Sequence, residues 1–144
     1  MGTDLIEIRS VAESIQIFGE RYLSRVFAPN ELKYCASIAS QGGDGTPHLA
    51  ARFAAKEAVM KVLRPRPCDA LSWKSIEVVR DGDGSCAVRL HGNALNLALR
   101  AGLFGFAVSL SHENQYASAV ALAEHRSLGM ARAPRPTSRQ TVSR

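Results

Sequence analysis

The stretch RFAAKEAVMKVL, residues 52–63, places four charged side chains in a short apolar segment that is rich in strong helix formers. The run from His48 to Leu63 contains neither Gly nor Pro. Pro47 precedes this run and Pro65 follows it, which is typical of a helix start and of a helix end. We therefore predict that the whole run is one helix. Its expected apolar stripe consists of Leu49, Phe53, Met60 and Leu63.

Glu57 and Lys61 are four residues apart, so they are neighbours on the surface of this helix. One interpretation is an ordinary surface ion pair, which is common and weak. The other is that a carboxylate and an ammonium group flank a partly buried pocket for a metal ion and a phosphate. We expect Lys56 to lie with its stem along the core and its head at the surface.

The length and composition indicate one globular domain, because 144 residues can bury a core and 46% of them are hydrophobic. No apolar stretch is long enough to span a membrane, and no signal peptide is visible, so we expect a cytoplasmic protein. Three widely spaced cysteines fit neither a disulfide framework nor a zinc site, which favours free, partly buried thiols.

The net charge of +5 comes from the C-terminal tail, residues 126–144, which holds five arginines and no acidic residue. Without it, the 18 basic side chains fall to 13, equal to the 13 acidic ones. We predict that the tail is disordered and that residues 1–125 form the domain. The balanced domain carries no nucleic-acid-binding motif, so we expect no nucleic-acid partner.

The remaining patterns indicate a mixed α+β domain with a small antiparallel sheet. Residues 2–8, GTDLIEI, read as a strand end that runs into a helix. The following helix should cover residues 10–24 and bury Val11, Ile15, Phe18 and Tyr22, although Gly19 weakens it; Asn30 can cap the next helix, which starts near Glu31. Further along, we expect strands at 73–80 and 86–90 around a DGDG turn, a helix at 93–100, and strands at 106–112 and 116–124.

Four places carry residue types that could do chemistry: Asp4, Glu31, the Glu57–Lys61 pair and His112. Each has an ordinary explanation on its own, such as a helix cap, a favourable helix-dipole contact or a strand-end histidine. Taken together, carboxylates from separate elements, a lysine and a histidine fit a site for Mg²⁺ and phosphate. Mg²⁺ takes one or two carboxylates together with phosphate oxygens and water, and lysine acts on phosphate as a point charge.

Over residues 2–124 the chain resembles the holo-[acyl-carrier-protein] synthases, which are small 4'-phosphopantetheinyl transferases. The resemblance is carried by GTDLIEI, FAPNELKYC, RFAAKEAVMKVL and VSLSHENQYASAVAL, in the order and roughly the spacing of that family. It implies the 4'-phosphopantetheinyl transferase-like fold, a function in fatty acid biosynthesis, and a reaction that uses coenzyme A and Mg²⁺. A serine of an apo acyl carrier protein attacks the β-phosphorus of coenzyme A, and adenosine 3',5'-bisphosphate leaves.

The same resemblance implies roles for individual residues. Asp4 and Glu57 would be the Mg²⁺ ligands, Lys61 would hold the pyrophosphate, and Arg52 and His112 would contact phosphates of coenzyme A. The acceptor of the serine proton is left open between a metal-bound water and a carboxylate. A homotrimer with sites between subunits is also implied.

The chain departs from the family pattern at Ser10, where the family commonly has an arginine. The carrier-docking surface is therefore expected among Arg9, Arg21 and Arg25. The alternative to an enzyme is a non-catalytic carrier-protein-binding subunit of the same fold.

Overall fold

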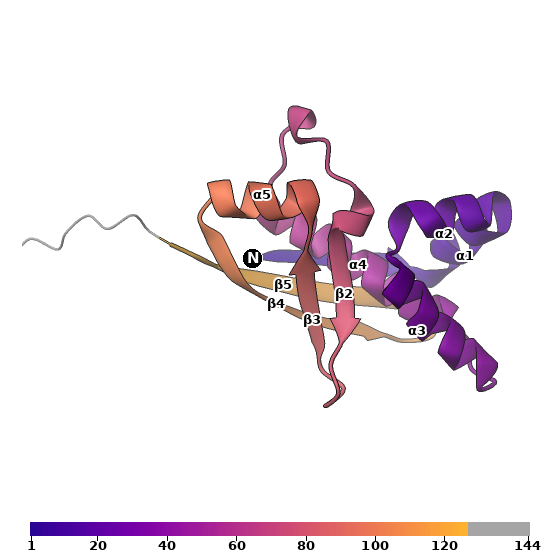
Figure 1. Ribbon diagram of the computed structural model, residues 1–144. Coiled ribbons are helices and arrows are strands. Elements are labelled where there is room, and N and C mark those ends of the chain that lie inside the picture. The colour runs from indigo at the N-terminus through magenta and orange to yellow at the C-terminus, as the bar shows by residue number, and fades with distance from the viewer. Residues whose placement is uncertain (127–144) are drawn as a thin grey trace, which may run out of the picture.

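The computed structural model describes residues 1–126, so the predicted tail lies, apart from Arg126, outside the described residues. Five α-helices and five strands follow one another along this part of the chain (Figure 1). In chain order they are β1 (Gly2–Glu7), α1 (Ile8–Phe18), α2 (Glu20–Val26), α3 (Pro29–Ser40), α4 (Thr46–Leu63), β2 (Ile76–Arg80), β3 (Cys86–Leu90), α5 (Gly92–Arg100), β4 (Leu103–His112) and β5 (Tyr116–His125).

The strands form two antiparallel sheets where one small sheet was predicted. β5 lies between β1 and β4 in a three-stranded sheet, and β2 pairs only with β3 as a separate hairpin. Both pack on α4, and Ile76 and Val78 of the hairpin share one core cluster with Ala119 and Ala121 of β5. The α+β class is therefore confirmed, with α4 as the element that joins the two sheets.

Helix α4 begins two residues before the predicted start and ends at Leu63, as predicted. The predicted single apolar stripe is wrong, because α4 is buried around most of its circumference. The many alanines of α4 allow this close packing. Phe53 and Met60, which were predicted to be part of the stripe, are only half-buried. β1 approaches so closely that a Cβ atom on Gly2 would lie 2.1 Å from the carbonyl oxygen of Ala58.

The predicted helix over residues 10–24 is instead two helices, α1 and α2, separated at Gly19. Gly19 adopts a φ of 53°, a conformation that side-chain-bearing residues rarely adopt, and the chain turns there. The turn removes Phe18 from the predicted buried face and leaves it 56% exposed, whereas Val11 is buried as predicted.

Three smaller expectations also differ from the structure. Asn30 does not cap α3: Ala28 occupies the N-cap position, and the Asn30 amide donates to the Glu77 carboxylate at 3.0 Å. Strand β2 begins at Ile76, because the three residues before it form a 3₁₀ turn. The cysteines are free, but Cys68 is exposed where a partly buried thiol was expected.

Within residues 1–126, no helix is long and apolar enough to cross a membrane.

Candidate active site

Strand β1 and helix α4 bring Asp4, Glu57 and Lys61 together. The Lys61 ammonium donates to the Asp4 carboxylate at 2.9 Å and to the carbonyl oxygen of Thr3 at 2.7 Å. Lys61 therefore pairs with a residue 57 positions away in sequence, and the predicted alternative of a Glu57–Lys61 surface pair is not what forms. Asp4 is 17% exposed and Lys61 is 52% exposed, so this group lies at the surface.

Glu57 is half-buried one turn before Lys61 on α4. Burial, followed by the negative charge of Asp4, raises the pKa of Glu57, and Lys61 opposes this shift. The two carboxylates are thus close enough to repel each other. Such a pair is stabilised when a cation binds between or beside its members.

Arg52, nearer the start of α4, is a buried cation without an acidic partner among the described residues. It is 3% exposed, its Nη1 donates to the His48 carbonyl oxygen at 3.2 Å, and its Nε has no hydrogen-bond partner. Its guanidinium lies 4.3 Å from the centre of the Tyr34 ring. Buried polar groups are nearly always hydrogen-bonded, so Arg52 has a hydrogen-bonding capacity that an anion could use.

Beside Arg52 is a cavity of about 350 Å³ between α4, the hairpin and the end of β4. Its polar lining consists of His48, Arg52, Arg80, Ser111 and His112, with no acidic side chain among its described lining residues. The rings of His48 and His112 are in edge-to-face contact with centres 4.8 Å apart. Burial, followed by the charges of His112, Arg52 and Arg80, lowers the pKa of His48.

The two groups of residues are placed by one helix and one sheet. Along α4, Arg52 is about 7.5 Å before Glu57 and about 13.5 Å before Lys61 at 1.5 Å per residue. Across the sheet, Asp4 is in register with Ala119 and Leu110, and His112 lies two residues further along β4. The structure therefore places the five predicted site residues in two separate groups: Asp4, Glu57 and Lys61 in one, Arg52 and His112 in the other.

The structure corrects the prediction for Lys56, whose head is not at the surface. Lys56 is fully buried and pairs at 2.8 Å with Glu31, which is also fully buried. The ammonium also donates to the carbonyl oxygens of Trp73 and Ile76, and the carboxylate accepts from the backbone N–H groups of Ala28 and Val78. Burial lowers the pKa of Lys56, and Glu31 opposes this shift. The pair joins α3, α4 and β2 behind the site.

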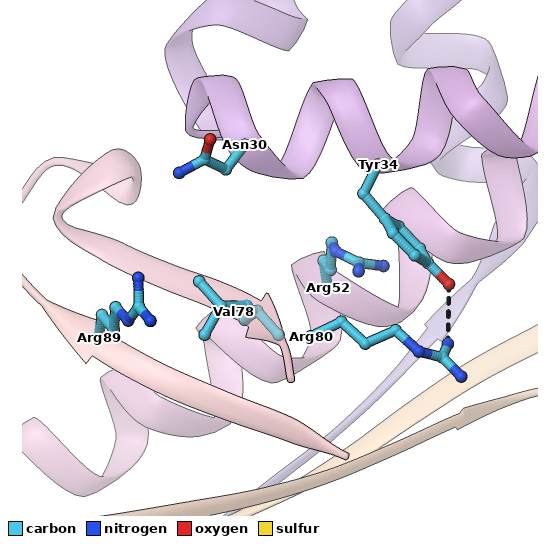
Figure 2. Close-up of a pocket in the computed structure, with 7 residues that line it drawn as sticks. Asn30, Tyr34, Arg52, Val78, Arg80 and Arg89 are labelled. Carbon is cyan, nitrogen blue, oxygen red and sulfur yellow. Dashed lines mark hydrogen bonds between the residues drawn. The ribbon is translucent and has the colours of Figure 1, made fainter. Parts of the chain in front are cut away.

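Sequence reasoning also missed Tyr34, His48 and Arg80. His48 precedes Arg52 by four residues, a spacing that could have indicated a second polar residue on that face of the helix. Tyr34 and Arg80 are 46 residues apart, and nothing local indicates that the Arg80 guanidinium donates to the Tyr34 hydroxyl at 2.7 Å (Figure 2).

Comparison with known proteins shows the family of the chain. Residues 1–121 match the family model of the 4'-phosphopantetheinyl transferase superfamily. The chain belongs to this superfamily. The match covers nearly all of the described residues, including Asp4, Arg52, Glu57, Lys61 and His112.

Curated relatives narrow the family to the holo-[acyl-carrier-protein] synthases. The chain is 46% identical to such a synthase of Moorella thermoacetica over 85% of its own length and 91% of the relative. It is 43% identical to one of Dehalococcoides mccartyi, over 85% and 96% of the two chains. The family predicted from the sequence is thus confirmed, and the protein is an enzyme of the 4'-phosphopantetheinyl transferase class.

Solved structures show the same fold. A Chronobacterium ammoniagenes ACPS–CoA complex matches with a TM-score of 0.73 and 32% identity, covering 88% of this chain and 96% of that chain. The acyl carrier protein synthase of Mycobacterium tuberculosis matches with a TM-score of 0.62 and 35% identity, covering 87% and 96% of the two chains.

Proposed function

We propose that this enzyme transfers the 4'-phosphopantetheine group of coenzyme A to a serine of an apo acyl carrier protein in fatty acid biosynthesis. The reaction depends on Mg²⁺ and releases adenosine 3',5'-bisphosphate. The observation that carries the proposal is that α4 contributes residues to two charged positions. A carboxylate pair with a lysine lies at one position, and a buried arginine without an acidic partner lies at the other.

Asp4 and Glu57 suit Mg²⁺ as its protein ligands. Mg²⁺ binds through one or two carboxylates and takes its other ligands from water and substrate phosphate. When bound, Mg²⁺ neutralises charge on the pyrophosphate.

Lys61 and Arg52 supply charge at the two ends of the nucleotide. Lys61 attracts the pyrophosphate through its ammonium group and stabilises the negative charge that develops on the departing bisphosphate. Coenzyme A carries one other phosphate, the 3'-phosphate of its ribose. We assign this phosphate to Arg52 and His112, because their cavity lies more than one helical turn from Glu57.

The acidic carrier protein is proposed to dock on α2. Arg21 and Arg25 are exposed and one turn apart on this helix, whereas Arg9 forms an ion pair with Glu13 at 2.9 Å. Exposed complementary charges mainly raise the rate of encounter and are screened by salt.

Reversal of Arg21 and Arg25 to Glu should lower kcat/KM for the carrier about tenfold at low salt, because it repels the acidic partner. The apparent affinity for coenzyme A should be unchanged. Steady-state kinetics that vary each substrate separately, at several salt concentrations, measure both effects. Equal losses for both substrates, or a wild-type rate that does not fall with salt, would contradict docking on α2.

We propose a homotrimer because one face of the three-stranded sheet is covered by neither the helices nor the hairpin. The helices and the hairpin pack on the side that carries Asp4 and Ala119, as the register and the core clusters require (Figure 1). The opposite side exposes five large apolar side chains: Leu5, Phe104, Tyr116, Val120 and Leu122. Monomeric proteins rarely expose such a patch. We propose that two further copies of this chain pack on it in the trimer.

Substitution of both Val120 and Leu122 by Glu should therefore convert trimers into monomers, because each buried interface would receive unpaired charges. Light scattering coupled to size exclusion measures the mass. Leu99→Glu is the matched control, since Leu99 is 66% exposed on α5 and should leave assembly unchanged. A wild-type protein that is monomeric at micromolar concentration would overturn the trimer.

Mass spectrometry of an apo carrier protein after incubation with the enzyme, coenzyme A and Mg²⁺ tests the function. The expected result is a mass gain of one phosphopantetheine unit on a serine. Binding of several carriers without any gain would instead support a non-catalytic carrier-binding subunit.

A further inference from the structure

Two guanidinium groups contact the side chain of Tyr34, one at its ring and one at its hydroxyl. Arg52 is 4.3 Å from the ring centre and Arg80 is 5.7 Å from it, and the Arg80 Nη1 also donates to the Tyr34 hydroxyl at 2.7 Å. Figure 2 shows the two arginines reaching the ring from different elements, Arg52 from α4 and Arg80 from the end of β2. A single aromatic side chain on α3 thus fixes two cations close to each other.

Both cations belong to the cavity that ends at His112, since Arg52 and Arg80 line it together. Neither forms an ion pair with an acidic group in the described chain, so their repulsion is not offset by a carboxylate. A doubly charged anion would offset it, and two guanidinium groups can present several donors to one phosphate.

We propose that Arg80, held by Tyr34, is a specificity-determining residue that makes this enzyme select coenzyme A with its 3'-phosphate over 3'-dephospho-coenzyme A. The inference rests on the proposed function, because it requires coenzyme A in this cavity. Arg80 contacts the phosphate alongside Arg52, and Tyr34 is a positioning residue that acts through the two arginines.

Arg80 also holds the wall of the cavity. It is the last residue of β2, and a Cβ atom placed on Gly84 in the following turn would lie 3.4 Å from its Nη2. Its bond to Tyr34 therefore ties the hairpin turn to α3 on the side where Gly84 and Cys86 line the cavity.

A neighbouring arginine provides a matched control. Arg89 is exposed on β3 and lines the adjacent cavity of about 240 Å³, which also contains Arg52 and Arg80, but it does not line the His112 cavity. It is in register with Glu77, whose pKa its charge helps to lower. Arg89 thus has a nearby carboxylate, whereas Arg80 has a tyrosine.

Calorimetric titration of coenzyme A and of 3'-dephospho-coenzyme A into the full chain tests the proposal. The wild type should prefer coenzyme A. Arg80→Ala should weaken coenzyme A binding about tenfold, the usual size of a hydrogen bond to a charged group, and leave the dephospho compound nearly unchanged. Arg80→Lys should restore part of the preference, and Arg89→Ala should keep all of it.

Tyr34→Phe keeps the ring against Arg52 and removes only the acceptor for Arg80. It should raise KM for coenzyme A about threefold and leave kcat unchanged, because Arg80 loses one hydrogen bond to a neutral hydroxyl. Equal weakening of both compounds by Arg80→Ala, a loss in Arg89→Ala as large as in Arg80→Ala, or a wild type without preference would each overturn the proposal. These binding results do not test the proposed transferase function. That function would fail if the carrier protein gained no mass in the mass-spectrometry assay.

Discussion

Asp4→Asn and Glu57→Gln should each lower turnover about 10²- to 10³-fold at millimolar Mg²⁺. Each substitution removes a proposed ligand of the ion, and charge stabilisation by a metal ion is worth several kcal/mol in a transition state. Both replacements keep the side-chain shape, so the loss would report on charge and not on packing. The carrier-modification assay measures it.

Folding should be nearly unchanged in both variants. The Asp4–Lys61 ion pair has a half-exposed lysine, and pairs of this kind contribute about 0–1 kcal/mol. Asp81→Asn in the turn between β2 and β3 is the control, because this carboxylate is exposed and lies outside β1, α2 and α4. Turnover near the wild-type value in either site variant at ordinary Mg²⁺ would show that the ligand assignment is wrong.

Lys56→Met should lower the free energy of unfolding by about 3–5 kcal/mol. Glu31 and Lys56 are both fully buried, so removal of one partner leaves the other as an unpaired buried charge. Two backbone carbonyl oxygens would also lose a donor. Urea unfolding of the variant and the wild type at one protein concentration measures the difference.

The double variant Glu31→Gln, Lys56→Met distinguishes the cost of an unpaired buried charge from the cost of the lost hydrogen bonds to the backbone. It should recover part of the loss, because no unpaired charge remains, although the carboxylate no longer serves the N–H groups of Ala28 and Val78. Lys33→Met is the matched control, since Lys33 is exposed on α3 and should change the free energy of unfolding by less than about 0.5 kcal/mol. A loss below about 1 kcal/mol in Lys56→Met would contradict the buried pair.

The sequence by itself determined the elements whose signals are local. The absence of Gly and Pro between His48 and Leu63 predicted α4, and a two-residue alternation around a DGDG turn predicted the hairpin. The strands at the end of the domain were also predicted, though β4 begins at Leu103, three residues earlier than expected. Such patterns act within one turn or one strand, so they require no knowledge of the partner.

The sequence named some residues of the candidate site and missed others, and it did not predict the contacts between them. Asp4, Glu57 and Lys61 were named from residue type and from the family's motifs, but the sequence offered Glu57 as the neighbour of Lys61. The tertiary structure pairs Lys61 with Asp4, because β1 packs against α4 through Gly2. A contact across 57 residues depends on how two elements pack, which no local pattern contains.

Tertiary packing alone decided the burial of Lys56 and the place of Tyr34. A lysine on a helix edge predicts a solvated head group, and only the approach of α3 and β2 turns that edge into an interior with Glu31 and two carbonyl oxygens. Tyr34 meets Arg80 for the same reason, since α3 and the hairpin both pack on α4. The local sequence sets which helices and strands form, whereas the environment of a charge depends on every element that closes around it.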